Sequence, residues 1–214
     1  MSIAAEPARD CPLCPRLVAY RHENRAANPD WWNGPAPSFG DPNAALLIVG
    51  LAPGRTGANR TGRPFTGDFA GDLLYGTLLK FGLARGAYRA DPQDGLTLVG
   101  AMITNAVRCA PPQNKPETSE IAACRPFLAA RIEALPKLKT LLALGAIAHD
   151  SVLRAEGVRP SAAKFAHGAQ TLLPSGRVLV SSYHCSRYNT QTNRLTPAMF
   201  EAALERAARL AGAL

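Results

Sequence analysis

The stretch "AALLIVGLAPGRTGANRTGRPFTGD", residues 44–68, joins an apolar segment to a glycine-rich loop. Residues 45–50 are continuously apolar rather than alternating, which is typical of a strand buried on both faces of a parallel sheet. The loop that follows lacks the Lys-Ser/Thr ending of a P-loop and has no G-x-G-x-x-G motif. The loop therefore does not indicate a nucleoside triphosphate or dinucleotide site.

Strands and helices alternate along the rest of the chain. Apolar residues at helical spacing predict a helix from Phe69 through Leu83, with Gly86 as its stop. Another strand should end near Asn105, and Thr196 should cap a C-terminal helix that has Pro197 in its first turn. Further elements are expected as follows: helices at 117–136 and 146–157, a strand at 138–145, and two short strands within 170–184.

This alternation predicts an α/β fold, a three-layer αβα sandwich around a central, mostly parallel four-stranded sheet. No repeat or linker divides the sequence, so residues 1–214 are expected to form one domain. In such sheets, binding sites form where loops leave the carboxyl ends of strands. The glycine-rich loop, "NAVRC" at 105–109 and "HCSRYN" at 184–189 are such loops. Their polar residues are expected to converge.

Composition favours a polyanionic partner. The chain has a net charge of +8, a pI of about 9.6, and no apolar run long enough to suggest a membrane span. Its N-terminus, "MSIAAEPARDCPLC", lacks the pattern of a signal peptide, so a cytoplasmic location is the expectation. A basic surface is compatible with nucleic acid but does not by itself identify it.

The cysteines form two groups. Cys11 and Cys14 make a C-x-x-C pair, Cys109 and Cys124 make a wider pair, and Cys185 stands apart. A thioredoxin-type redox pair is disfavoured at the N-terminus, because no strand precedes it and no clear helix-start pattern follows it. Four thiolates suit a tetrahedral zinc or an iron–sulfur cluster, and spacing alone does not choose between them or exclude ordinary buried cysteines.

The loops and the cysteine pattern together resemble the iron–sulfur branch of the uracil-DNA glycosylase superfamily, specifically its broad-specificity family 5 (type B). The resemblance runs from Cys11 to about Asn189 and rests on the glycine-rich loop, "TNAVRC", "HCSRYN" and the four cysteines. One departure is visible, because the family's His-Pro-Ser is here His184-Cys185-Ser186. The resemblance implies a monofunctional DNA repair enzyme that flips uracil out of DNA and hydrolyses its N-glycosidic bond.

Three residues carry the expected recognition of the base. Phe65 offers a flat face for stacking, and its Arg, Pro and Gly neighbours make a core helix or strand position unlikely. Asn105 offers a donor and an acceptor that match a carbonyl beside an N–H, although an asparagine at a strand end also caps loops. His184 can donate to the uracil carbonyl nearest the breaking bond and stabilise the developing anion.

Activation of water is assigned to Asp68. Related families place a carboxylate or amide where this chain has Ala52, whose methyl group cannot orient water. Asp68 closes the same loop, and it also fits as the N-cap of the following helix. The two roles are compatible.

The remaining expected contacts also follow from the resemblance. Glycines 50, 54, 57, 62 and 67 should let the loop fold tightly around a base, whereas Arg187 should act as a wedge in the duplex. Base-binding residues are expected to be Gly50, Leu51, Ala52, Pro53, Gly54, Phe65 and Asn105. DNA-binding residues are expected to be Arg55, Arg60, Arg63, Ser186 and Arg187.

The resemblance further implies a cofactor and partners. Cys11, Cys14, Cys109 and Cys124 match the ligands of a 4Fe-4S cluster remote from the chemistry, whereas Cys185 matches no ligand. The expected partner is DNA with deaminated bases, including hypoxanthine, in double-stranded and single-stranded form. The enzyme is expected to be a monomer associated with the nucleoid of a prokaryote.

Two alternatives remain open from the sequence. A single-strand DNA crosslinking relative of the same superfamily carries a basic insertion with a histidine after the asparagine loop, and "NAVRCAPPQNKP" has none. The other alternative is a metal-stabilised nucleic-acid-binding module without catalysis. The trio Asp68, Asn105 and His184 argues against that module.

Overall fold

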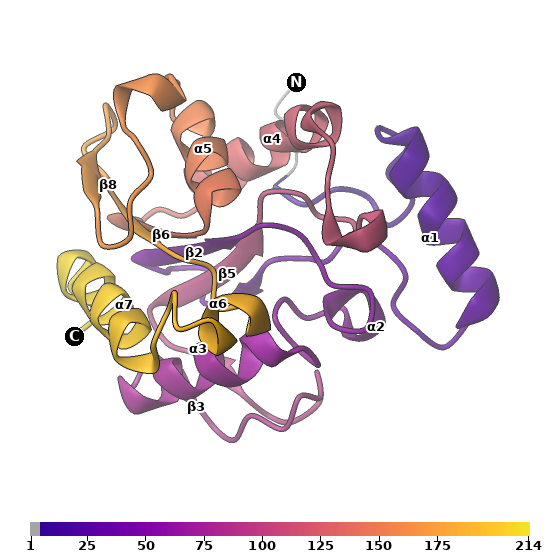
Figure 1. Ribbon diagram of the computed structural model, residues 1–214, viewed down its shortest axis with the longest axis horizontal. Coiled ribbons are helices and arrows are strands. Elements are labelled where there is room, and N and C mark those ends of the chain that lie inside the picture. The colour runs from indigo at the N-terminus through magenta and orange to yellow at the C-terminus, as the bar shows by residue number, and fades with distance from the viewer. Residues whose placement is uncertain (1–4) are drawn as a thin grey trace.

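The computed structural model describes residues 5–214. Residues 1–4, which belong to the predicted single domain 1–214 and to the stretch assessed for a signal peptide, lie outside the described residues. A six-stranded sheet forms the centre of the molecule, in the order β1-β5-β2-β6-β8-β7 (Figure 1). The inner four strands are parallel: β5 (Ala101–Asn105), β2 (Leu46–Gly50), β6 (Thr140–Leu144) and β8 (Val178–Ser182).

The sequence predicted these four parallel strands. The short strand at one edge, β7, matches the first of the two short strands expected within 170–184, whereas the short strand at the other edge, β1, was not expected. The edge strands β1 (Phe39–Gly40) and β7 (Gln170–Leu172) pair antiparallel with their neighbours. A separate two-stranded ribbon consists of β3 (Ala84–Arg85) and β4 (Thr97–Leu98). Strands of two residues carry too little pattern to be recognised in a sequence.

Helices cover both faces of the sheet, which confirms the three-layer architecture (Figure 1). On one face, α3 (Phe69–Lys80) and α7 (Pro197–Ala211) pack with Leu46 and Ile48 of β2. On the other face, α4 (Thr118–Glu133) and α5 (Ala146–Ala155) pack with Leu47 and Val49. Successive residues of β2 therefore enter opposite cores, which explains its continuous apolar sequence.

The helix ends follow local chemistry. Asp68 caps α3 by accepting a hydrogen bond from the Gly71 N–H at 3.1 Å. Thr196 caps α7 through the Met199 N–H, as the sequence predicted. The helix predicted to reach Leu83 ends at Lys80, because Gly82 adopts a left-handed φ of 70° and breaks the helical path.

A helix absent from the prediction follows the first cysteine pair. Helix α1 (Pro15–Ala27) begins directly after Cys14, with proline in its first turn. The sequence shows no convincing helix-start pattern there, yet a helix forms. Only Leu17, Arg21 and Asn24 of α1 are buried, so the helix has little apolar periodicity that could reveal it.

Four short helical segments complete the described chain: α2 (Ala58–Thr61), α6 (Arg187–Gln191) and the 3-10 turns Pro112–Asn114 and Pro160–Ala162. Among residues 5–214, no helix combines the length and apolar character needed to cross a membrane.

Candidate active site

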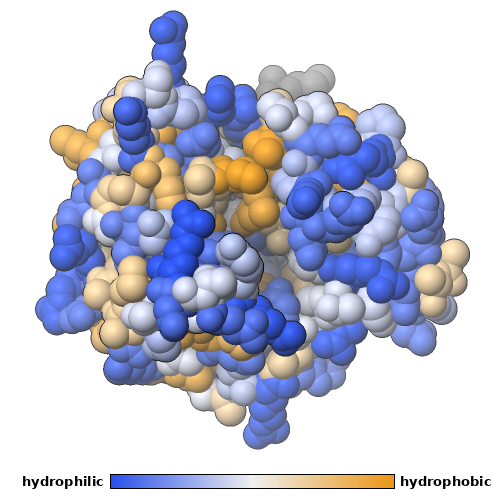
Figure 2. All heavy atoms as spheres, in the orientation of Figure 1, coloured by the Kyte–Doolittle hydropathy of each residue, from blue (hydrophilic) through white to orange (hydrophobic). Residues whose placement is uncertain are grey.

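The carboxyl ends of the parallel strands surround a cleft of about 650 Å³. Figure 2 shows a hollow near the centre of the displayed face, where hydrophobic residues gather among hydrophilic ones. The cleft brings together most residues predicted for the site: Leu51, Ala52, Pro53, Gly54, Arg55, Phe65, Asp68, Asn105, His184, Ser186 and Arg187. The predicted convergence of the three loops is therefore present in the structure.

Gly50 and Asn105 end adjacent parallel strands in direct register. A Cβ atom on Gly50 would clash with Asn105 Oδ1 and would lie 2.6 Å from Phe65 Cζ. The missing side chain at position 50 thus lets the Asn105 amide and the Phe65 ring approach each other closely. Within residues 5–214, buried Asn105 Oδ1 has no hydrogen-bond partner, as expected of a group that pairs with a ligand.

His184 follows β8 and faces the same pocket. Its ring lies 5.8 Å from the Phe65 ring, centroid to centroid, at an interplanar angle of 26°. Asn189 fixes its backbone by donating from Nδ2 to the His184 carbonyl at 2.8 Å. Burial lowers the pKa of His184 to about 4, so the imidazole is neutral at physiological pH.

The ring nitrogens of two histidines differ in their partners. His149 is buried, and its nitrogens contact Ser181 Oγ and the Ala163 carbonyl, each at 2.8 Å. In contrast, buried His184 Nδ1 has no hydrogen-bond partner within the described chain. His149 is therefore satisfied by the protein, whereas His184 retains hydrogen-bonding capacity.

The two carboxylate oxygens of Asp68 have different surroundings. Oδ1 caps α3, while Oδ2 lies 3.6 Å from the position that a Gly54 Cβ would take. Burial raises the pKa of the Asp68 carboxyl, which makes it a stronger base than an exposed aspartate. Gly57 leaves room for this side chain, because a Cβ there would lie 2.7 Å from Asp68 Oδ2.

Arg63 does not line the cleft, and its surroundings give no support to its predicted DNA contact. Its side chain is 4% exposed and pairs with fully buried Asp94 at 2.8 Å. An arginine held in this way is not available to a phosphate.

Arg55 and Arg60 are exposed but have different surroundings. Arg55 lines the cleft, donates to Asn24 Oδ1 at 2.8 Å and lies over the Trp31 ring. Arg60 instead lines a separate surface groove with Trp31 and Trp32, so only Arg55 is placed at the cleft itself.

The glycines of the loop serve the loop's own packing more than contact with a base. Of the five, only Gly54 lines the cleft. Gly62 ends α2 in a left-handed conformation at φ 78° and packs against Trp32. A Cβ on Gly67 would lie 2.5 Å from an Arg60 nitrogen. The expectation that all five fold around a base was therefore too broad.

The cleft also includes residues that the sequence reasoning did not identify. The first turn of α5, Ala146–Ala148, follows β6 into the cleft, together with Asn114, Tyr188 and Arg194. The signal for α5 was present, because β6 is a parallel strand whose carboxyl end must meet the same edge. However, Gly145 and the first turn of α5 carry no ionisable or amide side chain, so nothing in their chemistry indicated a site.

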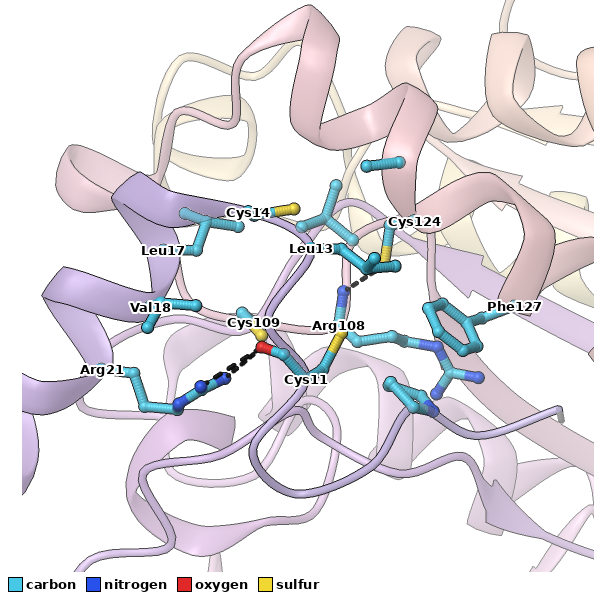
Figure 3. Close-up of a pocket in the computed structure, with 13 residues that line it drawn as sticks. Cys11, Leu13, Cys14, Leu17, Val18, Arg21, Arg108, Cys109, Cys124 and Phe127 are labelled. Carbon is cyan, nitrogen blue, oxygen red and sulfur yellow. Dashed lines mark hydrogen bonds between the residues drawn. The ribbon is translucent and has the colours of Figure 1, made fainter. Parts of the chain in front are cut away.

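The four cysteines lie together around a second, much smaller cavity of about 20 Å³ (Figure 3). Cys11 and Cys14 precede α1, Cys109 follows β5, and Cys124 lies on α4. The backbone N–H of Arg108 donates to Cys124 Sγ at 3.3 Å. Burial raises the pKa of the Cys109 thiol to about 12 and that of the Cys124 thiol to about 11.

Four thiols around one cavity are the donor type that an iron–sulfur cluster takes. All four thiols surround one cavity with apolar walls that include Leu17, Val107 and Phe127. Yet within residues 5–214 no three His, Cys, Asp or Glu side chains converge as a single metal ion requires. Cys185 lies elsewhere, fully buried in the core, with Sγ 3.6 Å from the Ala70 carbonyl.

The fold and cleft define an α/β protein with a partly apolar cleft at the carboxyl edge of its sheet. The family profile described as the uracil DNA glycosylase superfamily matches residues 37–208, and the chain belongs to this superfamily. A type-5 uracil-DNA glycosylase of Thermus thermophilus is 50% identical, with 94% of each chain covered. The type-5 enzyme of Mycobacterium leprae is 43% identical, covering 94% of this chain and 92% of that protein. The type-5 uracil-DNA glycosylase of Pyrobaculum aerophilum is 39% identical, covering 96% of this chain and 91% of that protein.

Proposed function

We propose that the protein is a uracil-DNA glycosylase that flips uracil from DNA and hydrolyses its N-glycosidic bond. The observation that carries this proposal is the cleft in which Phe65 lies beside two buried polar atoms, Asn105 Oδ1 and His184 Nδ1, which have no hydrogen-bond partner in the described part of the chain. Unsatisfied buried groups are costly unless a ligand pairs with them. The superfamily membership and the names of the relatives support the same activity.

Each pocket residue has a distinct role in this proposal. Phe65 stacks on the flipped ring, and Asn105 pairs with the edge that presents a carbonyl beside an N–H. His184, neutral because its pKa is about 4, donates a hydrogen bond to the uracil carbonyl nearest the breaking bond. Negative charge develops on the base as the bond breaks, so this bond strengthens in the transition state.

Asp68 completes the hydrolysis in this proposal. Its Oδ2 accepts a proton from the attacking water and balances the positive charge that builds on the sugar. Its raised pKa and its fixed position as the cap of α3 support this role. Ala52 lines the same cleft but offers no polar atom.

The lip of the cleft would hold the DNA. Arg55 and Arg187 are exposed cations at the cleft, and their charges suit phosphates flanking the flipped nucleotide. Arg187 is the residue that we assign as the wedge. Ser186 caps α6 through the Asn189 N–H at 3.4 Å, so its DNA contact would be made from a preformed helix end.

We further propose that the pocket accepts hypoxanthine. Strict uracil enzymes resemble one another in placing a tyrosine where this chain has Gly54, whose absent side chain leaves that wall open. Hypoxanthine presents a carbonyl beside an N–H, as uracil does, so the Asn105 amide pairs with it equally well. Its weaker pairing in a duplex also lowers the cost of flipping.

The four-cysteine cavity is proposed to hold a 4Fe-4S cluster with Cys11, Cys14, Cys109 and Cys124 as ligands. When bound, the cluster would supply structural bracing, because it would tie the start of α1 to α4 and to the loop after β5. The four thiols around one cavity and the resemblance of the cysteine pattern to the iron–sulfur branch support this proposal.

We infer that the enzyme acts as a monomer on double-stranded and single-stranded DNA. A cytoplasmic location near the nucleoid would follow from a DNA substrate.

Single-turnover release of uracil from duplex DNA tests the proposed activity. Asn105→Ala should reduce release severely, and His184→Ala should slow the chemical step about 100- to 1,000-fold with less effect on binding, as for other lost oxyanion donors. Asn43→Ala and His22→Ala make the same chemical changes at exposed positions and should change nothing. Near-full activity of both pocket variants while folded would refute the site, and binding without base release by the wild type would identify a non-catalytic module.

A further inference from the structure

The backbone at Phe65 has a conformation that a bulky residue rarely adopts. Its φ is +54°, in the left-handed region that favours glycine. Such a conformation persists only where the surrounding structure enforces it. The residues that enforce it at Phe65 therefore determine where the proposed stacking ring lies.

Two tyrosine hydroxyls hold the turn around Phe65. The Tyr75 hydroxyl donates to the Pro64 carbonyl at 2.7 Å. The Tyr88 hydroxyl donates to the Phe65 carbonyl at 3.1 Å and accepts from the Gly67 N–H at 3.4 Å. The two tyrosine rings stack on each other with centroids 4.6 Å apart, which fixes both hydroxyls.

Gly71 of α3 makes this arrangement possible. A Cβ at position 71 would clash with the Phe65 carbonyl oxygen and with the Tyr88 hydroxyl. The turn is thus packed directly on the first part of α3, with no space for a side chain between them.

Arg63 ties the same turn to a distant segment. Its Nε donates to Thr66 Oγ1 at 2.7 Å, and its two terminal nitrogens each donate to Asp94 at 2.8 Å. Asp94 also accepts from the backbone N–H groups of Arg89 and Leu96, each at 3.0 Å. The Arg63 guanidinium lies 5.3 to 5.7 Å from the rings of Phe39, Tyr75 and Tyr88.

We propose that Tyr88 and the Arg63–Asp94 ion pair are positioning residues that hold the Phe65 ring preformed for stacking on the flipped base. Both Tyr88 and Asp94 come from the segment 86–96, between β3 and β4, which does not line the cleft. This inference rests on the proposed function, in which Phe65 contacts the flipped base. Loss of a positioning residue should therefore weaken binding of the base rather than binding of DNA in general.

Two duplexes separate these effects. One carries an uncleavable 2′-fluorinated deoxyuridine, and the other carries a tetrahydrofuran abasic analogue at the same position. Tyr88→Phe removes one hydroxyl and keeps the ring, so it should weaken binding of the uracil duplex about fivefold, the usual effect of one lost hydrogen bond. Binding of the abasic duplex, which has no base to stack, should change less than about twofold.

Tyr20→Phe is the matched control, because Tyr20 lies on α1 and its hydroxyl makes no hydrogen bond within the described residues. It should leave both affinities unchanged. Asp94→Asn keeps the shape of the side chain but leaves Arg63 without its countercharge, and it should act in the same direction as Tyr88→Phe. If Asp94→Asn does not fold, Tyr88→Phe decides alone.

The results separate this inference from the proposed function. Equal losses on the two duplexes would show a general structural defect and overturn the positioning role, as would no loss on either. A wild-type protein that releases no uracil would refute the proposed function itself. A wild type that releases uracil, with a Tyr88→Phe variant of unchanged affinity, would refute only the positioning role.

Discussion

His184 lies where burial keeps its imidazole neutral, with a pKa of about 4. An unfolded histidine titrates near 6.5. Between about pH 6.5 and pH 4 the unfolded chain therefore binds a proton that the folded protein excludes. The folded state should lose stability as pH falls through this window, with no contribution from His184 above it.

Thermal unfolding at pH 7 and pH 4.5 checks this expectation. Relative to His184→Gln, the wild type should lose at most about 3 kcal/mol of unfolding free energy on acidification. Other titrating groups are common to both proteins, so their contributions cancel. A pH dependence identical in the two proteins would show that His184 is not desolvated.

Gly54 is a second single position with a measurable consequence. A Cβ there meets only ordinary contacts, at 3.6 Å from Asp68 Oδ2 and 4.0 Å from the Gly57 nitrogen, so the backbone can accept a side chain. Gly54→Tyr should narrow the pocket and reduce hypoxanthine release much more than uracil release. Gly54→Ala should have little effect. Single-turnover assays on matched duplexes measure the release of uracil and of hypoxanthine. If the wild type releases uracil alone and Gly54→Tyr changes nothing, the pocket is not open at position 54.

At the scale of elements, α6 presents the proposed wedge. Arg187 is the first residue of this short helix, and its guanidinium lies 5.4 Å from the Phe69 ring. Arg187→Ala should lower affinity for duplex more than for single strands, because only a duplex has a gap to fill. Arg154→Ala, an exposed change on α5, is the control. Binding titrations with duplex and single-stranded DNA measure both affinities. Equal losses of affinity for the two substrates in Arg187→Ala would contradict the wedge role of Arg187.

The elements differ in how well the sequence predicted them. The inner strands were predictable because each enters two cores and carries a run of apolar residues, such as residues 46–49 in β2 and 141–144 in β6. Helix α1 was missed because only three of its residues are buried. Its place depends instead on contacts remote in sequence, such as Arg16 with Glu120 at 2.7 Å.

The site was predictable only where a residue's chemistry and its place at a strand end agreed. Asn105 and His184 met both conditions, and both line the cleft. Arg63 has a chemistry that suits a phosphate, but it does not lie at a strand end. Its partner Asp94 lies 31 residues away in the sequence, so nothing local indicates the ion pair. Tyr88 carries no signal in the sequence, because its role depends on a tertiary contact with the Phe65 carbonyl.

At the scale of the whole molecule, the four-cysteine cavity joins segments that are far apart in the sequence. Cys11 and Cys14 lie near one end of the chain, while Cys109 and Cys124 belong to the loop after β5 and to α4. Purified protein should be brown and should hold about four irons per chain. Cys109→Ala should lose the iron, and Cys185→Ala should keep it. Colourless protein with one zinc, after preparation without oxygen, would contradict the cluster.

The pairing of Gly50 with Asn105 also limits the evolutionary paths open to this pocket. Any side chain at position 50 would strike both the Asn105 amide and the Phe65 ring. A side chain could be accepted at position 50 only after Asn105 and Phe65 had been replaced or moved. Positions 50, 65 and 105 are therefore expected to change together in evolution. Directed evolution toward new bases should therefore vary positions 50, 65 and 105 together, because single changes at position 50 would be lost before any benefit could appear.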